Sequence, residues 1–240
     1  MLSHPGVGTR PVSSHPYPQR IVVARALGVL GLIAYNWWVL VLFQPGWTTS
    51  IDGFFSDMSA DGQPHAWMMQ RADIVAGGLL IAALLLRGPV GSDGTRRREW
   101  KWLVAFASLG AIGGRFPYAC AAGLDATCRR LERSLDLPWH HYVHMAAGVG
   151  EFATITLAIW LAYRRTRGTD SFEASVFRFL IYLLVVAYPL LAVAYLGDVW
   201  GALIEPVFFM AFTSMLVAEL FEPAGSRSAA SRSRSRAASG

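Results

Sequence analysis

Three ionisable side chains in the stretch PWHHYVHMAAGVGEFATI have the spacing of a single helical face. At 100° per residue, His140, Glu151 and His144 fall within roughly 40° of one another, and Glu151 lies about 16 Å below His140 along the axis. Two histidines at i and i+4 could bind one Zn²⁺, with a carboxylate such as Asp73 from another helix completing the site. Alternatively, His140 lies among lipid headgroups and His144 bonds to a neighbouring helix.

A second concentration of polar chemistry lies in the segment TTSIDGFFSDMSADGQPHAWMMQRAD, residues 48–73. We expect this segment to fold back over the end of a helical bundle and to line an outward-facing pocket. Ser56 or Asp57 could instead cap a helix, because both are favoured at such positions. Arg71 and Asp73 could form no more than a local ion pair.

Two more charged residues stand at the ends of hydrophobic stretches. Arg115, in GGRFP, could bind phosphate through two hydrogen bonds, or could reach past the membrane edge to lipid headgroups. Glu205 directly precedes Pro206 and needs a partner, such as Arg115 or His144. An ionisable group in hydrocarbon costs several kcal/mol unless it faces the protein interior, water or a partner. The pocket candidates are therefore Ser56, Asp57, Arg71, Asp73, Arg115, His144, Glu151 and Glu205.

Six hydrophobic stretches must position these side chains, and each is close to the ~20 residues that cross ~30 Å of hydrocarbon. They cover residues 21–43, 70–87, 101–117, 140–163, 174–196 and 200–221. The stretches are apolar all round and lack the alternation of a membrane β-strand. The sequence therefore predicts an all-α polytopic membrane protein, a bundle of six transmembrane helices.

The basic residues predict the orientation of this bundle. Most of the 21 Lys and Arg residues lie at the amino end, between stretches two and three, between four and five, and in the tail. By the positive-inside rule, both termini are cytoplasmic in the plasma membrane, and segments 44–70, 118–139 and 197–199 face outward. The basic residues behind the net charge of +5 thus set the orientation in the membrane, and we expect no nucleic-acid partner. Membrane lipids or a membrane protein are the expected partners.

The chain divides by composition into three parts. Residues 1–20 predict a disordered cytoplasmic arm, residues 21–222 the transmembrane domain, and residues 223–240 a disordered Arg- and Ser-rich cytoplasmic tail. The first hydrophobic stretch has the length of a span and no convincing cleavage site, which predicts an uncleaved signal anchor.

The two cysteines, Cys120 and Cys128, fall in one outward-facing loop, CAAGLDATC. We expect a disulfide, since the exterior of the membrane permits one, although two free thiols stay open as the alternative. Zinc is disfavoured as their partner, because no second closely spaced thiol pair accompanies them.

The order of these features resembles uncharacterised six-span bacterial membrane proteins related to the FRAG/DRAM family. The resemblance is carried by the segment FFSDMSADGQP, by Arg71 and Asp73 opening the second span, by RFP ending the third and by the histidines opening the fourth. It covers most of residues 21–221 and implies mainly a fold. Eukaryotic members are linked to lipid-anchor remodelling and autophagy, and the CAAGLDATC loop departs from the shared pattern.

A fainter resemblance is to alkaline ceramidases and adiponectin-receptor-like membrane hydrolases. These proteins hold zinc with a serine, an aspartate and a histidine pair, which would map to Ser56, Asp73, His140 and His144. The relatives have seven spans and place the histidines on the last one, whereas this chain predicts six spans with the histidines on the fourth.

Three functions from different classes follow from these observations. We favour a protein without a cofactor, whose outward-facing pocket binds a lipid headgroup or a membrane partner. The alternative is a zinc-dependent hydrolase of lipid amides or esters, in which metal-bound water attacks the carbonyl and Asp57 or Glu205 moves a proton. The third is an ion-coupled transporter that uses Glu151 and Glu205.

Overall fold

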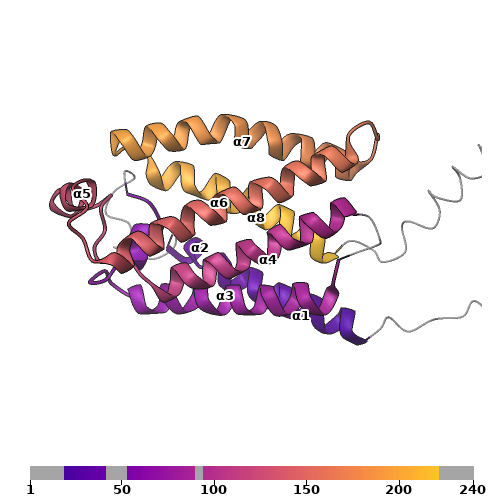
Figure 1. The fold of residues 1–240 in the computed structure, drawn as a ribbon, viewed down its shortest axis with the longest axis horizontal. Helices are drawn as coiled ribbons and strands as arrows, with labels where there is room; N and C mark the ends of the chain where they lie inside the picture. Colours follow the sequence, from indigo (N-terminus) through magenta and orange to yellow (C-terminus); the bar gives the residue numbers. More distant parts are fainter. Residues whose placement is uncertain (1–18, 42–52, 90–93, 222–240) are drawn as a thin grey trace, which may run out of the picture.

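The computed structural model describes residues 19–41, 53–89 and 94–221, and over these ranges the regular structure is helical, without strands. Figure 1 shows a bundle of long helices with short helices at one end. The long helices are α1 (Gln19–Tyr35), α3 (Ala66–Arg87), α4 (Gly94–Arg115), α6 (Trp139–Thr166), α7 (Phe172–Gly197) and α8 (Gly201–Phe221). The short ones are α2 (Trp38–Val41), the 3-10 helix η1 (Ser56–Ser59) and α5 (Ala126–Arg133).

Four of the long helices, α3, α6, α7 and α8, are long and apolar enough to cross a membrane. The predicted class, an all-helical membrane protein, is therefore confirmed. The other two differ from these four. Helix α1 is shorter, at 17 residues, and the first turns of α4 contain the charged run Arg96–Lys101. The predicted arm and tail lie almost entirely outside the described residues; α1 begins at Gln19, two residues before the predicted boundary.

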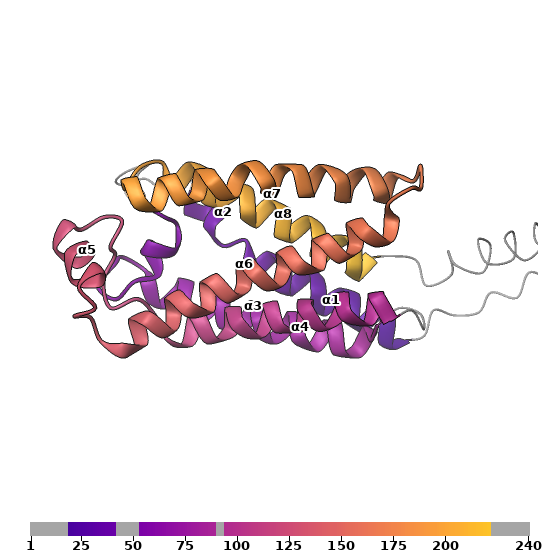
Figure 2. The same cartoon turned by 45° about the horizontal axis from the view of Figure 1, so that its top comes forward.

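The helices form a closely packed side and a looser side. Helices α1, α3, α4 and α6 follow one another side by side, while α7 and α8 pack along the other side of the bundle (Figures 1 and 2). Glycines permit the close approach of α3 and α4. A Cβ on Gly77 would lie 2.6 Å from the Ala107 carbonyl oxygen, and one on Gly114 would lie 2.7 Å from that of Gln70. Small residues at a helix interface let two backbones meet and gain van der Waals contacts.

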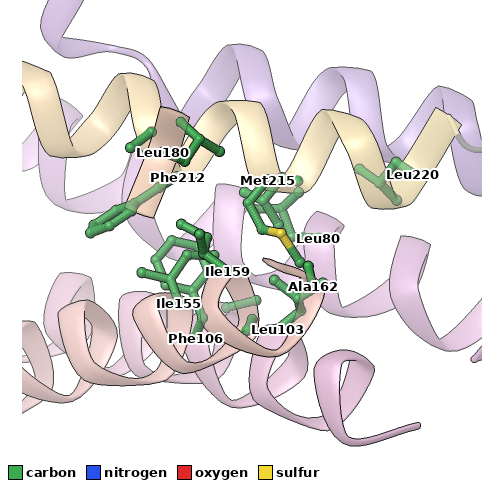
Figure 3. Close-up of a cluster of buried hydrophobic side chains, with 14 of the residues drawn as sticks. Leu80, Leu103, Phe106, Ile155, Ile159, Ala162, Leu180, Phe212, Met215 and Leu220 are labelled. Carbon is green, nitrogen blue, oxygen red and sulfur yellow. The ribbon is translucent and has the colours of Figure 1, made fainter. Parts of the chain in front are cut away.

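An apolar core fills the half of the bundle that lies away from α5. Figure 3 shows its side chains from α3, α4, α6, α7 and α8 meeting in one cluster. Phe106 and Phe212 pack edge to face with their ring centroids 5.7 Å apart, and both are almost fully buried. The other half of the bundle is less completely filled, and the candidate site lies there.

The first predicted span, 21–43, is interrupted in the structure. Helix α1 ends at Tyr35, and a turn at residues 36 and 37 precedes α2. The Asn36 side chain donates to the Leu32 carbonyl oxygen at 2.8 Å, so it takes an acceptor inside the last turn of the helix. The same side chain bonds to Thr213 of α8, which fixes the break against a neighbouring helix. The turn directs Trp37 towards α3.

The loop between α4 and α6 contains a disulfide and a helix that the sequence did not predict. Cys120 and Cys128 are bonded, with an S–S distance of 2.00 Å, which confirms the predicted bridge. The second cysteine lies in α5, whose first turn is capped by Asp125: its carboxylate accepts from the Thr127 and Cys128 amides at 2.7 and 3.4 Å.

Candidate functional site

A cavity of about 900 Å³ lies between the long helices in the half of the bundle nearest α5. Residues from every long helix line it, together with residues from α2, η1, α5 and the adjoining loops, and its wall is mostly apolar. This volume is in the range of cavities that hold organic ligands.

Three carboxylates from three helices project into the cavity: Asp73 of α3, Glu151 of α6 and Glu205 of α8. Asp73 accepts a hydrogen bond from the Trp37 indole at 2.6 Å. The break after α1 therefore brings an indole donor to this carboxylate. Glu205 is 5% exposed and accepts from the Ser56 amide at 3.2 Å. Tyr35 lines the same cavity as these three carboxylates.

Glu151 differs from the other two because no described group donates a hydrogen bond to it. Its side chain lies against α4 at a glycine: a Cβ on Gly110 would lie 2.5 Å from the Glu151 Oε1. The residue is half-buried although it lies in the middle of a long helix, because it faces the cavity rather than packed side chains. An unsatisfied carboxylate at this depth is costly, so it indicates a place for a ligand or a proton.

The roof of the cavity, residues 53–61, is held by Asp57. Its Oδ2 accepts from the Phe54 amide at 2.9 Å, and its Oδ1 accepts from the Gly123 amide at 3.2 Å. These bonds join the roof to the disulfide loop, and Gly123 is too close to the Asp57 carboxylate to carry a side chain. Burial raises the pKa of Asp57 above its ordinary value.

A charged mouth cluster, formed by Arg129, Glu132, Arg133 and Asp198, borders the cavity at the end nearest α5. Asp198 pairs with Arg129 at 3.0 Å and with Arg133 at 3.1 Å. Glu132 accepts from the Tyr195 hydroxyl at 2.9 Å. Among the described residues, the guanidinium groups that line the cavity are those of Arg129 and Arg133, at the rim of the cavity.

Two histidines of α6 have defined hydrogen bonds. His141 is fully buried; its Nδ1 accepts from the Ala119 amide, so its Nε2 carries the proton and donates to Glu132 at 2.9 Å. The Nδ1 of His144 lies 2.9 Å from the Gly113 carbonyl oxygen and 3.0 Å from that of Phe116, so Nδ1 is the donor and Nε2 remains an acceptor.

Comparison with known proteins places this chain in a family. The family model described as "Protein of unknown function (DUF998)" matches residues 26–221. The chain belongs to this family. No curated protein and no solved structure matches it. The predicted membership of an uncharacterised membrane family is confirmed, whereas the predicted links to the FRAG/DRAM family and to alkaline ceramidases are not tested by this match and stay predictions.

Most of the predicted pocket residues of this DUF998 protein line the cavity described above. They are Ser56, Asp57, Asp73, His144, Glu151 and Glu205. The two predicted arginines do not line it. Arg71 is exposed and lies over the Trp67 ring at 5.4 Å, and Arg115 is exposed and lies over the Phe116 ring at 5.7 Å.

The predicted zinc ligands are distributed differently. Asp73 and His144 line the cavity, whereas His140 does not. Among the described residues, no group of three histidine, cysteine or acidic side chains has the arrangement of a metal site. Zinc binding therefore stays a prediction from the sequence.

Sequence reasoning missed the aromatic wall and the mouth cluster. Tyr35, Trp37 and Trp38 line the cavity beside the carboxylates. The available signal was Asn36, whose side chain competes with the helix in the middle of a predicted span. For the mouth cluster, the signal was the i, i+3 and i+4 spacing of Arg129, Glu132 and Arg133, which indicates one charged face of a short helix.

Proposed function

We propose that this protein is a six-span binding protein of the plasma membrane with both termini in the cytoplasm, and that its cavity takes a lipid headgroup that bears a positively charged amine. The orientation is supported by charge. The Arg96–Lys101 run of α4 and the basic end of α6, with Arg164 and Arg165, lie at the end of the bundle where α1 starts and α8 finishes (Figure 1).

The observation that carries the proposed ligand is the convergence of Asp73, Glu151 and Glu205 in one mostly apolar cavity. Like charges repel, and the repulsion is stronger in an apolar cavity than in water because the effective dielectric constant is lower. The described arginines of the lining are at the rim and are already paired with Asp198. A cation bound among the three carboxylates removes this repulsion.

The aromatic wall supports an organic cation rather than a bare metal ion. Tyr35, Trp37 and Trp38 line the same cavity as the carboxylates, and Tyr35 packs against Phe209 with ring centroids 5.9 Å apart. An ammonium group over an aromatic ring gains roughly 0.5–2 kcal/mol, most where water is excluded. The apolar remainder of the wall suits the hydrocarbon attached to such a group.

The proposal is tested by calorimetric titration of the protein in nanodiscs with decyltrimethylammonium and, in parallel, with decanol. We expect the cation to bind and Glu151→Gln to weaken it at least tenfold, because no described protein group neutralises that carboxylate. Asp170→Asn is the matched control, since Asp170 is an exposed carboxylate outside the cavity. Equal binding of decanol and the cation, or an unchanged affinity in Glu151→Gln, would contradict the proposal.

A transporter is the second candidate, and the position of Glu151 favours it. A carboxylate without a described donor in the middle of a helix can exchange a proton for a cation. Flux of decyltrimethylammonium into proteoliposomes, driven by a pH gradient and absent in Glu151→Gln, would select this function over binding alone. Binding without flux would reject it.

A further inference from the structure

The cavity is open on one side of the bundle. Two of its lining residues are also largely exposed: Val149 is 72% exposed and Tyr195 46%. Val149 belongs to α6, and Tyr195 belongs to α7. Among the residues that the structure describes, the wall between these two helices is therefore incomplete.

The opening ends at Tyr188. The Tyr188 hydroxyl donates to the Phe152 carbonyl oxygen at 3.1 Å and lies 2.5 Å from the Thr156 hydroxyl, so it joins α7 to α6. On the side of Tyr188 nearer the α6–α7 loop, Leu184 and Ile159 are buried in the apolar core. Figures 1 and 2 show the two helices close together near that loop and separating towards α5.

The length of the opening matches one leaflet of a bilayer. From Tyr188 to the end of α7 at Gly197, the helix rises about 14 Å, and one leaflet contributes half of the ~30 Å of hydrocarbon. In the proposed orientation this is the outer leaflet. The side chains that border the opening, among them Val149 and Leu191, are those that would meet lipid chains.

We infer that the gap between the outer halves of α6 and α7 is a lateral opening through which the cavity receives an aminophospholipid of the outer leaflet. This inference rests on the proposed function and names the ligand. The ammonium group lies among Asp73, Glu151 and Glu205, and the phosphate faces Arg129 and Arg133 at the rim. The acyl chains pass between α6 and α7 into the bilayer.

Size and charge both favour this occupant. A cavity of about 900 Å³ fits a drug-sized molecule, whereas a diacyl phospholipid is larger, so its chains must leave the cavity. A water-soluble ligand needs no apolar side opening. A lipid with an anionic headgroup would meet the three carboxylates without a compensating ammonium group.

The opening is tested by filling it from either helix. Ala192 lines the cavity from α7 and is exposed. Gly148 lines it from α6, and a Cβ on this glycine would meet no atom within 4 Å. Ala192→Trp and Gly148→Phe should therefore narrow the gap without disturbing packed atoms. Val193→Trp is the matched control, because Val193 is 52% exposed and does not line the cavity.

The readout is native mass spectrometry of the protein titrated with phosphatidylethanolamine or with phosphatidylglycerol of the same chains, beside decyltrimethylammonium binding to each variant. We expect phosphatidylethanolamine to bind in preference, Ala192→Trp and Gly148→Phe to lose it at least tenfold, and Val193→Trp to keep it. Decyltrimethylammonium, which is small enough to need no lateral exit, should bind to the wild type and to Val193→Trp, neither of which alters the cavity lining.

If both narrowed variants bind phosphatidylethanolamine with the affinity of the wild type, the lateral opening is overturned. Equal binding of the two phospholipids would overturn the aminophospholipid, and so would binding of decyltrimethylammonium alone. Failure of the wild-type protein itself to bind decyltrimethylammonium would instead contradict the proposed function, so the two failures are distinguishable.

Discussion

The contact between α3 and α4 can be tested with two adjacent glycines of α3. In Gly77→Ala, the new methyl carbon would lie 2.6 Å from the Ala107 carbonyl oxygen and 2.7 Å from the Ala111 Cβ. An ordinary contact needs 3.4 Å or more, so the helices must separate by about 0.8 Å. In Gly78→Ala, the methyl group meets nothing within 4 Å.

The two variants share the same change in helix propensity, which favours alanine by about 1 kcal/mol. Their difference therefore isolates the clash. Overpacking of this kind costs typically about 1–3 kcal/mol, so we expect Gly77→Ala to be less stable than Gly78→Ala by that amount. For a chain of this length, the difference corresponds to a melting temperature lower by roughly 2–12 °C.

The measurement is thermal unfolding of the detergent-purified variants. The readout is the fraction of protein that stays monodisperse on size exclusion after heating. Equal melting temperatures for the two variants would refute the reasoning, because α3 and α4 would then not be in contact at Gly77. A destabilised Gly78→Ala would refute it as well, since that position faces open space.

Three further perturbations have expected outcomes. Replacing Cys120 and Cys128 by serine removes a cross-link with a sequence separation of 8, and thermal unfolding should show a loss of about 2–3 kcal/mol. Because burial raises the pKa of Asp57, the stability from its bound proton is complete below the ordinary carboxyl pKa and is lost as the pH rises through the raised value. Unfolding measured from about pH 4 to 7 should thus show the wild type losing stability relative to Asp57→Asn; a constant difference would contradict this. Arg165→Met leaves Glu99, which is 1% exposed, without the guanidinium 2.9 Å away, and should cost about 3–5 kcal/mol in chemical denaturation, most of it restored by Glu99→Gln in the same chain.

The helices and most of the acidic site residues were predictable because the membrane imposes strong constraints. Hydrocarbon admits a spanning segment only if it is long and apolar, so hydropathy located the long helices. The cost of an ionisable group in that environment identified Asp73, Glu151 and Glu205 as residues that face the interior. The same constraint does not hold at the membrane edge. Arg71 and Arg115 have long side chains that extend over the Trp67 and Phe116 rings instead of entering the cavity.

The remainder of the site depends on contacts between distant segments. Trp37 reaches Asp73 only because α1 breaks after Tyr35, and that break is fixed by a bond from Asn36 to Thr213, 177 residues away in the chain. Hydropathy cannot show such a break, since the residues on both sides of it are apolar. The roof likewise depends on a bond from the Gly123 amide to Asp57, across 66 residues.

The backbone of Gly110 in the cavity wall has a consequence for how the shape of the cavity can evolve. On the α4 side, Gly110 contributes only backbone to the wall, and a Cβ there would lie 2.5 Å from the Glu151 Oε1 of α6, so any side chain at this position collides with α6. On the α7 side, Leu191, Ala192 and Tyr195 contribute side chains that are at least partly exposed. Substitutions there change the shape of the cavity at little cost to folding. We therefore expect family members whose cavities differ in shape to differ mainly along α7, while Gly110 stays constant.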